Sequence, residues 1–219
     1  MTQSAEQFLS ERYRRTMDDA AGHWDSVYET KVGNGVSWFQ AEPSISLRLL
    51  ERWASPARSV IDIGAGASTL ADVLLDVGWL DVTVLDISEE ALKNVRHRLG
   101  ERAEATTFIS ADIRSWVPNN IYDAWHDRAV FHFLVEQADR DRYVALATQA
   151  IRPGGVMVLA TFAADGPTAC SGLPTRRYDT DELVRIFGPA FALEHAEREE
   201  HTTPFGTIQP FSWVVLRHM

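Results

Sequence analysis

The stretch SVIDIGAGAST, residues 59–69, decides the fold. Its first five residues are mostly apolar and β-branched, which is typical of a strand buried in a sheet. Gly64 and Gly66 follow, and TLADVLLDV (69–77) then predicts a helix with one apolar face. Because glycine has no Cβ, such a turn between a strand and a helix lets the backbone approach a ligand closely. The stretch therefore predicts a ligand site at the end of a buried strand.

Strands and helices alternate along the rest of the chain. After the first strand, the pattern predicts helices capped by Ser88 and Asp179 and a helix at 141–151. The other expected strands are at 81–86, 106–110, 122–127 and 156–162, with RPGG (152–155) as a turn before the last of these and a hairpin at 191–201 and 211–218. This order predicts an α/β fold with a doubly wound, mostly parallel sheet that ends in an antiparallel hairpin.

Composition and charge narrow the class of protein. The chain has 219 residues and 45% apolar residues, so we expect one domain over 1–219, with 1–55 as an N-terminal helical cap. Leu9, Tyr13 and Met17 share one face of the helix expected at the start of this cap, and Pro43 opens a second helix. A net charge of −10 argues against a nucleic-acid partner.

Targeting and metal signals are missing from the sequence. No apolar run reaches the roughly 18 residues that a membrane span needs, and the first residues do not resemble a signal peptide. We therefore expect a cytoplasmic protein that does not bind a membrane. Cys170 is the single cysteine, so it forms no internal disulfide and gives no cysteine pair for a metal. We expect no metal cofactor.

Acidic residues at the strand ends point to a nucleoside ligand. Asp86 ends the second strand about 20 residues after the glycines, where a carboxylate accepts both hydroxyls of a ribose. Asp112 ends the third strand and is placed to accept from an adenine amino group, with Ile87 and Ile113 as apolar faces for the ring. Thr69 replaces the third glycine of a dinucleotide fingerprint, which weakens the alternative of a nicotinamide dehydrogenase. A nucleoside without phosphates fits better.

Together with the terminal hairpin, these motifs resemble those of class I S-adenosylmethionine-dependent methyltransferases. VIDIGAG (60–66), VTVLDIS (82–88), ADI (111–113) and YDAWHDRAVFHF (122–133) resemble the first four motifs of the family, and the likeness extends from His23 onward. It implies a Rossmann-like fold with seven strands and S-adenosylmethionine as the cofactor. The implied cofactor-binding residues are Trp38, Asp62, Gly64, Ala65, Gly66, Asp86, Ile87, Asp112, Ile113, Asp127 and Arg128, with Asp62 at the methionine end.

Two subfamilies bear on the acceptor. HWDSVYETKVGNGVSWF (23–39) is similar to protein-lysine methyltransferases, whereas residues 122–155 and the DGP of 165–167 are similar to thiopurine and thiol methyltransferases. An inserted His126, and Thr168 in place of a second proline, depart from the thiol pattern. We expect a small, thiol-like acceptor. A protein-lysine N-methyltransferase and a non-catalytic S-adenosylmethionine-binding sensor remain as alternatives.

Residues after the fourth and fifth strands are the candidates for chemistry. In-line methyl transfer depends mainly on orientation and on excluding water, so a base is optional. His132 is the first choice for a general base, with Asp127 beside it; packing in the core is the alternative for His132. The loop 163–179 follows the fifth strand and is expected to bind the acceptor. The expected acceptor-binding residues are Trp38, Phe39, Arg176, Arg177 and His201.

Overall fold

The computed structural model describes residues 20–31, 35–54 and 59–219. The helix expected from Leu9, Tyr13 and Met17 lies outside these residues. Residues 20–30 are helical, which the sequence pattern did not assign. The helix expected after Pro43 is present as α2 (Ser44–Trp53).

Seven strands form one sheet in the order β3-β2-β1-β4-β5-β9-β8. The first five strands of this order are parallel, β9 is antiparallel to β5, and β8 is antiparallel to β9. The predicted sheet with its terminal hairpin is confirmed. The strands are β1 (Ser59–Ile63), β2 (Asp81–Asp86), β3 (Thr106–Ser110), β4 (Tyr122–Arg128), β5 (Ile151–Phe162), β8 (Phe191–Thr202) and β9 (Ile208–His218).

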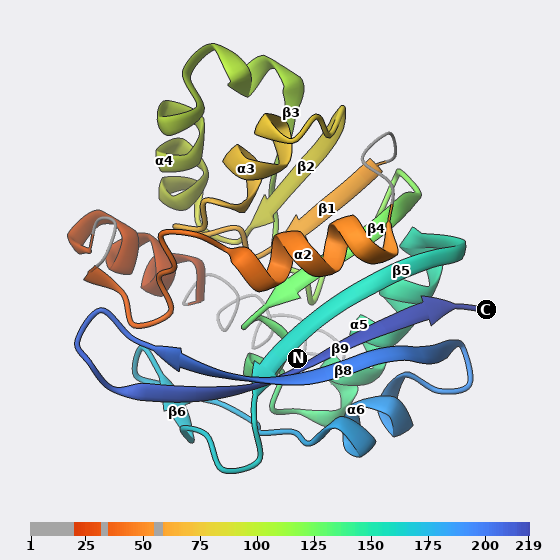
Figure 1. Cartoon of the computed structure of the whole chain (residues 1–219). Coiled ribbons are helices and arrows are strands. Elements are labelled where there is room, and N and C mark those ends of the chain that lie inside the picture. Colours follow the sequence, from red (N-terminus) through yellow and green to blue (C-terminus); the bar gives the residue numbers. More distant parts are fainter. Residues whose placement is uncertain (1–19, 32–34, 55–58) are drawn as a thin grey trace, which may run out of the picture.

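Helices cover both faces of the sheet, because successive residues of a buried strand point to opposite sides. In β1, Val60 packs into the core beneath α2, α3 (Leu70–Asp76) and α4 (Glu89–Leu99), whereas Ile61 packs against the other face. That face is covered by α5 (Gln137–Ala150) and α6 (Thr180–Phe187). Figure 1 shows α2 in front of the sheet and α5 behind it.

The two helix N-caps predicted from the sequence are present in the structure. The hydroxyl of Ser88 accepts a hydrogen bond from the backbone N–H of Ala91 at 3.1 Å. The carboxylate of Asp179 accepts from the N–H of Glu182 at 2.7 Å. Short 3₁₀ turns, η2 (Gly100–Ala105) and η3 (Phe131–Phe133), complete the helical segments.

The RPGG segment differs from the expected simple turn, because it lies within the bounds of β5. Ile151 pairs with Tyr122 of β4, and the next pair is Val156 with Ala124, so residues 152–155 form an irregularity in the strand. A Cβ at Gly155 would lie 2.9 Å from two backbone oxygens. Residues 152–155 are therefore a bulge-like interruption within β5 and not a turn that precedes the strand.

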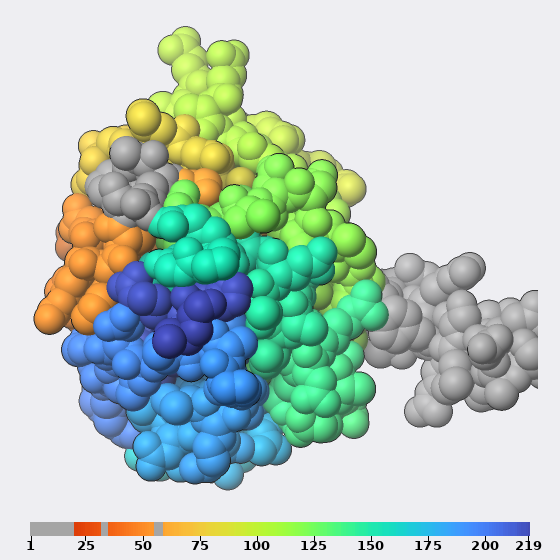
Figure 2. All heavy atoms as spheres, turned by 90° about the vertical axis from the view of Figure 1, so that its right-hand side faces the viewer, coloured from red at the N-terminus to blue at the C-terminus, as the bar shows by residue number. Residues whose placement is uncertain are grey.

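The carboxyl ends of the parallel strands meet at one edge, where ligands bind in open α/β sheets. The order of strands reverses between β1 and β4 at this edge. The loop 163–179 carries a small hairpin there, β6 (Ala169–Cys170) and β7 (Leu173–Pro174). Figure 2 turns the opposite end, with the C-terminus, toward the viewer. None of the described helices combines the length and apolar character that crossing a membrane requires.

Candidate functional site

A cavity of about 420 Å³ lies at the carboxyl ends of β1 to β4. The helix of residues 20–30 covers one side of it, and the β6–β7 hairpin borders another. The predicted site residues in its wall are Trp38, Gly64, Asp86, Ile87, Asp112, Ile113 and Arg128. The wall also contains residues that the sequence analysis did not predict as site residues, among them His23, Trp24, Tyr28, Phe133, Cys170 and Pro174.

The glycine turn after β1 is required by the protein's own packing as well as by an approaching ligand. Gly64 has φ +68°, and a Cβ there would lie 2.1 Å from Cγ2 of Val130. Gly66 has φ +46°, and a Cβ there would lie 2.3 Å from the hydroxyl of Tyr28. Positive φ and close contact both exclude a side chain. Gly66 and the buried Ala65 shape the turn, but only Gly64 of the three lies in the cavity wall.

Asp86 holds the glycine turn to the start of α4. Its Oδ2 accepts from the backbone N–H of Gly66 and its Oδ1 from that of Ser88, both at 2.8 Å. Burial raises the pKa of this carboxyl to about 6, against the hydrogen bonds that favour its charged form. A carboxylate accepts about four hydrogen bonds, so each oxygen keeps capacity for a ribose hydroxyl.

Asp112 is the second acid of the cavity wall, and it is already paired. Arg114 donates to it from Nε at 3.0 Å and from its own backbone N–H at 2.8 Å. Ile113 is 7% exposed and lies beside it in the wall, as does Ile87. An adenine amino group at Asp112 would therefore share the carboxylate with Arg114.

Asp62 is buried below the glycine turn and does not line the cavity. Its Oδ1 lies 2.7 Å from Nδ1 of His126, whose Nε2 lies 2.9 Å from the hydroxyl of Ser46. This pairing gives the inserted His126 a structural role. Oδ2 of Asp62 is buried without a partner among the described residues and so retains an acceptor for a water or an ammonium.

Asp127, expected to be a catalytic and cofactor-binding residue, lies outside the cavity wall. Its carboxylate is fully buried and accepts from the N–H of Val130 at 2.8 Å and of Phe131 at 3.1 Å. The hydroxyl of Tyr143 donates to it at 2.6 Å. Burial raises its pKa to about 6. The side chain turns away from the cavity and fixes the turn at Ala129, which has φ +79°.

His132, the first choice for a general base, is placed in the core, which favours the packing alternative. Its ring lies between Phe133 and Phe162, with centroids at 4.5 and 4.4 Å, and is fully buried. Nδ1 accepts from the N–H of Phe162 at 3.3 Å. Burial, and then the charge of Arg128, lower the pKa of His132 to about 3. The imidazole is neutral at physiological pH and lies outside the cavity wall.

Four of the five expected acceptor-binding residues lie outside the cavity wall, and only Trp38 lines it. Arg176 pairs with Glu182, and Arg177 is exposed. His201 is 5% exposed and its Nε2 donates to the carbonyl of Ser37 at 2.8 Å, so it positions the loop that bears Trp38. Phe39 belongs to the same loop. The loop 163–179 does reach the cavity, through Cys170, Leu173 and Pro174.

An aromatic group that the sequence interpretation only partly anticipated forms the cover of the cavity. The ring of Trp24 lies 6.1 Å from that of Tyr28, 5.8 Å from that of Trp38 and 5.3 Å from that of Phe133. The spacing of Trp24 and Tyr28, four residues apart, was the available signal, because it places both on one helix face. Nε2 of the neighbouring His23 is buried without a partner among the described residues.

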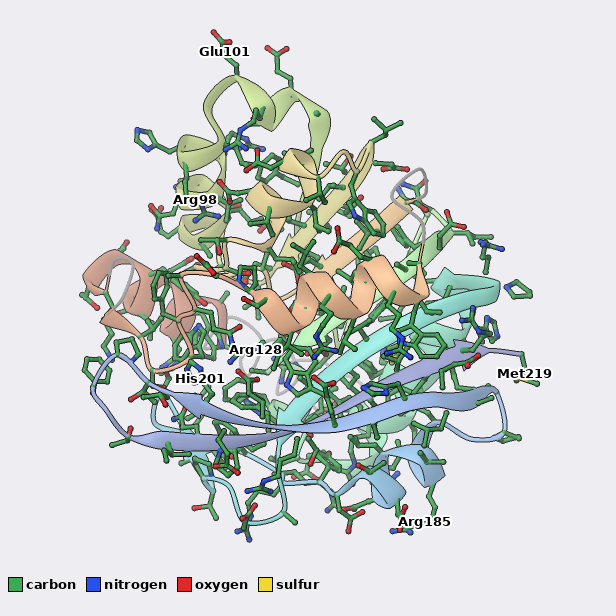
Figure 3. The ribbon with its side chains drawn as sticks, viewed as in Figure 1. Arg98, Glu101, Arg128, Arg185, His201 and Met219 are labelled. Carbon is green, nitrogen blue, oxygen red and sulfur yellow. The ribbon has the colours of Figure 1, made fainter. Side chains whose placement is uncertain are left out.

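Arg128 is the basic residue at the end of β4, and its side chain is 9% exposed. Figure 3 shows it in the interior, close to His201 in this view. Nη1 donates to the carbonyl of Trp38 at 2.9 Å, and the guanidinium lies 4.6 Å from the ring centroid of Phe211. Nε and Nη2 have no hydrogen-bond partner in the described chain. Each such buried donor costs roughly 1 to 3 kcal/mol.

Comparison with known proteins agrees with this geometry. Residues 61–159 match the methyltransferase domain family. The eEF1A lysine and N-terminal methyltransferase of Mus musculus is 28% identical over 151 residues, 66% of this chain and 22% of the relative. Thiocyanate methyltransferase 1 of Arabidopsis thaliana is 23% identical over 188 residues, 84% of this chain and 79% of the relative. A solved S-adenosylmethionine-dependent methyltransferase of Anabaena variabilis superposes with a TM-score of 0.73 at 16% identity, covering 93% of this chain and 95% of that one.

The match of residues 61–159 to the methyltransferase domain family, the seven-stranded sheet and the glycine turn support a class I S-adenosylmethionine-dependent methyltransferase, with S-adenosylmethionine as the cofactor. The chain spans 22% of the length of the mouse relative, so that protein's activity is not carried over as a whole. The described residues contain no group of three or more His, Cys, Asp or Glu side chains arranged to hold a metal ion.

Proposed function

We propose that the protein transfers the methyl group of S-adenosylmethionine to a small, thiol-like acceptor. The observation that carries this proposal is one cavity with two kinds of wall. Gly64, Asp86 and Asp112 line it at the strand ends, in the order that suits the methionine, ribose and adenine of the cofactor. Aromatic and apolar side chains line it on the side of Trp38 and Pro174.

The chemistry asks the protein chiefly for orientation. S-adenosylmethionine supplies a methyl group on a positively charged sulfur, which leaves as a neutral thioether when a nucleophile attacks in line. Asp86 and the glycine turn hold the nucleoside, and the aromatic cover of Trp24, Tyr28 and Trp38 keeps water from the reacting atoms. Positioning of this kind supplies several kcal/mol of the barrier reduction.

The position of the candidate bases favours an acceptor that loses its proton readily without help from the protein. His132 and Asp127 face the core and take no proton from a ligand in the cavity. His23 is the histidine in the wall, with Nε2 unpartnered. A thiol, with an ordinary pKa of about 8.5, needs less help to become a nucleophile than a lysine ammonium, at about 10.4. The match to a thiocyanate methyltransferase over most of both chains favours the same choice.

Protein-lysine methylation is the second candidate, and the match to the eEF1A methyltransferases favours it. A sensor that binds the cofactor without turnover is the third. The three differ in where a radiolabelled methyl group ends.

A methyl-transfer assay on a cell extract separates these candidates. The purified protein is incubated with methyl-labelled S-adenosylmethionine and an extract divided into protein and small-molecule fractions. Label in small or volatile products, together with S-adenosylhomocysteine formation, supports the proposal. Label in proteins overturns it in favour of the second candidate, and binding without turnover in favour of the third. At a cofactor concentration near the wild-type Kd, Asp86→Ala should strongly reduce the label, whereas Asp81→Ala, an exposed change at the other end of β2, should not.

A further inference from the structure

Arg128 is the cavity's buried cation with unused hydrogen-bond donors. Nε and Nη2 have no acceptor in the described chain, and the side chain is 9% exposed. The nearest carboxylate, Glu199, has Oε1 at 3.7 Å from Nη2, beyond hydrogen-bond distance. Its two oxygens already accept at 2.8 Å from Nε2 of Gln40 and Nε1 of Trp213. Glu199 therefore offsets the charge of Arg128 without satisfying its N–H groups.

The other acids of the cavity wall are engaged elsewhere. Asp86 accepts from backbone N–H groups, and Asp112 is paired with Arg114. These two carboxylates stand at the ends of β2 and β3, whereas Arg128 stands at the end of β4, on the other side of β1. A ligand group near Arg128 therefore meets a positive charge with open donor positions.

We propose that Arg128 binds an acidic group of the methyl acceptor, and that the acceptor is an organic acid with an apolar or aromatic body. The inference rests on the proposed function and names the class of its substrate. A carboxylate matches the planar guanidinium and fills donor positions that are otherwise unpaired. Trp38 and Phe133 offer apolar surface to the rest of such a molecule. A cationic acceptor such as a lysine side chain would meet the charge of Arg128, whose side chain is 9% exposed, so that the repulsion is screened less than in open water.

The cofactor's own carboxylate has the same chemistry, so the test must separate the two sources. S-adenosylhomocysteine is first titrated into the wild type and Arg128→Met by calorimetry, with 5′-methylthioadenosine, which lacks the amino-acid group, as the comparison. We expect Arg128→Met to change both affinities by less than about twofold. A loss of tenfold or more for S-adenosylhomocysteine alone would assign Arg128 to the cofactor and overturn the inference.

Benzoate and benzamide are then titrated into the complex with saturating S-adenosylhomocysteine, by ligand-observed NMR. These probes share one shape and differ in charge. We expect the wild type to prefer benzoate by at least about tenfold, the effect of one charge-assisted hydrogen bond. Arg128→Met should reduce the preference to less than about twofold, and Arg128→Lys should keep part of it. Arg98→Met removes an arginine that pairs with Asp72 outside the cavity and should leave the preference unchanged.

Each outcome has one meaning. Equal binding of benzoate and benzamide by the wild-type complex overturns the inference and leaves the proposed function intact. Binding of thiocyanate that depends on Arg128, without binding of benzoate, restricts the site to inorganic anions and also overturns it. No binding of S-adenosylhomocysteine at all refutes the proposed function itself. The ratio of two probes is insensitive to loosening of the Trp38 loop, so it remains informative if Arg128→Met loses some stability.

Discussion

Asp86→Ala tests the nucleoside site, and the structure predicts two separable effects. The substitution removes the acceptor for the N–H groups of Gly66 and Ser88. Two hydrogen bonds to a charged group are worth roughly 3 to 6 kcal/mol together. Burial opposes these bonds and raises the pKa of the carboxyl to about 6, a net value that already includes them. Alanine leaves the two N–H groups without this acceptor but also removes the buried charge, so we expect the free energy of unfolding to fall by no more than about 2 kcal/mol.

The expected loss of binding free energy for the cofactor is larger than the loss of stability. Loss of two bonds from ribose hydroxyls to a carboxylate should cost about 2 to 3 kcal/mol of binding, roughly 30- to 150-fold in affinity. Calorimetry with S-adenosylhomocysteine at pH 8 measures it, and urea unfolding measures the stability. Asp81→Ala, on the exposed first residue of the same strand, is the control and should change neither. An Asp86→Ala protein that folds and binds as tightly as the wild type would refute the assignment of the ribose to this residue.

Three further predictions concern the turn, the core histidine and pH. Gly64→Ala should lower the free energy of unfolding by about 3 kcal/mol, because the alanine would have a positive φ and its Cβ would clash with Val130. Gly78→Ala, at φ +91° with open space around the Cβ, should lower it only by the roughly 1 to 2 kcal/mol of backbone strain. Equal losses in urea unfolding would contradict the packing argument. His132→Gln should leave the methyl-transfer rate per folded molecule unchanged, and a hundredfold loss of rate in a stable variant would restore His132 to the mechanism. Because the pKa of His132 is lowered to about 3, the unfolded state binds the extra proton, so the wild type should lose up to about 1.4 kcal/mol per pH unit below pH 6.5 relative to His132→Gln. Asp86 affects stability in the opposite direction, because its folded state binds the extra proton between pH 3.8 and 6, so its contribution to the free energy of unfolding rises as the pH falls through this range. The ionised carboxylate binds the ribose, so the affinity for S-adenosylhomocysteine should fall by up to about tenfold per pH unit below pH 6. Asp86→Asn should not show this pH dependence.

The sheet and the nucleoside side of the cavity follow from local sequence. Buried parallel strands need continuous apolar runs, and their helices need one apolar face, so SVIDI and its successors are recognisable one at a time. The carboxyl ends of parallel strands lie at the same edge of the sheet, independently of how the connecting segments pack. Gly64, Asp86 and Asp112 are therefore brought to one cavity by the order of elements alone.

The acceptor side depends on side-chain direction, which local sequence does not encode. Asp127 and Arg128 are neighbours in β4 and point to opposite sides, so the acid is enclosed by Tyr143 while the arginine enters the cavity. His132 lies one short turn further on, but its ring packs against Phe162 in the core, and burial there lowers its pKa to about 3.

Distant segments complete the site, and only the tertiary structure brings them together. The helix of residues 20–30 carries Trp24 over the strand ends, and Glu199 of β8 approaches Arg128 of β4 from the C-terminal hairpin. The sequence by itself determined the sheet and the glycine and acidic residues at the strand ends, because period and spacing are local properties, and the resemblance of its motifs indicated the class of protein. The tertiary structure decided which histidine, arginine and aromatic rings face the cavity, because that depends on contacts between residues far apart in the chain, as between Trp24 and Phe133 and between Trp38 and Arg128.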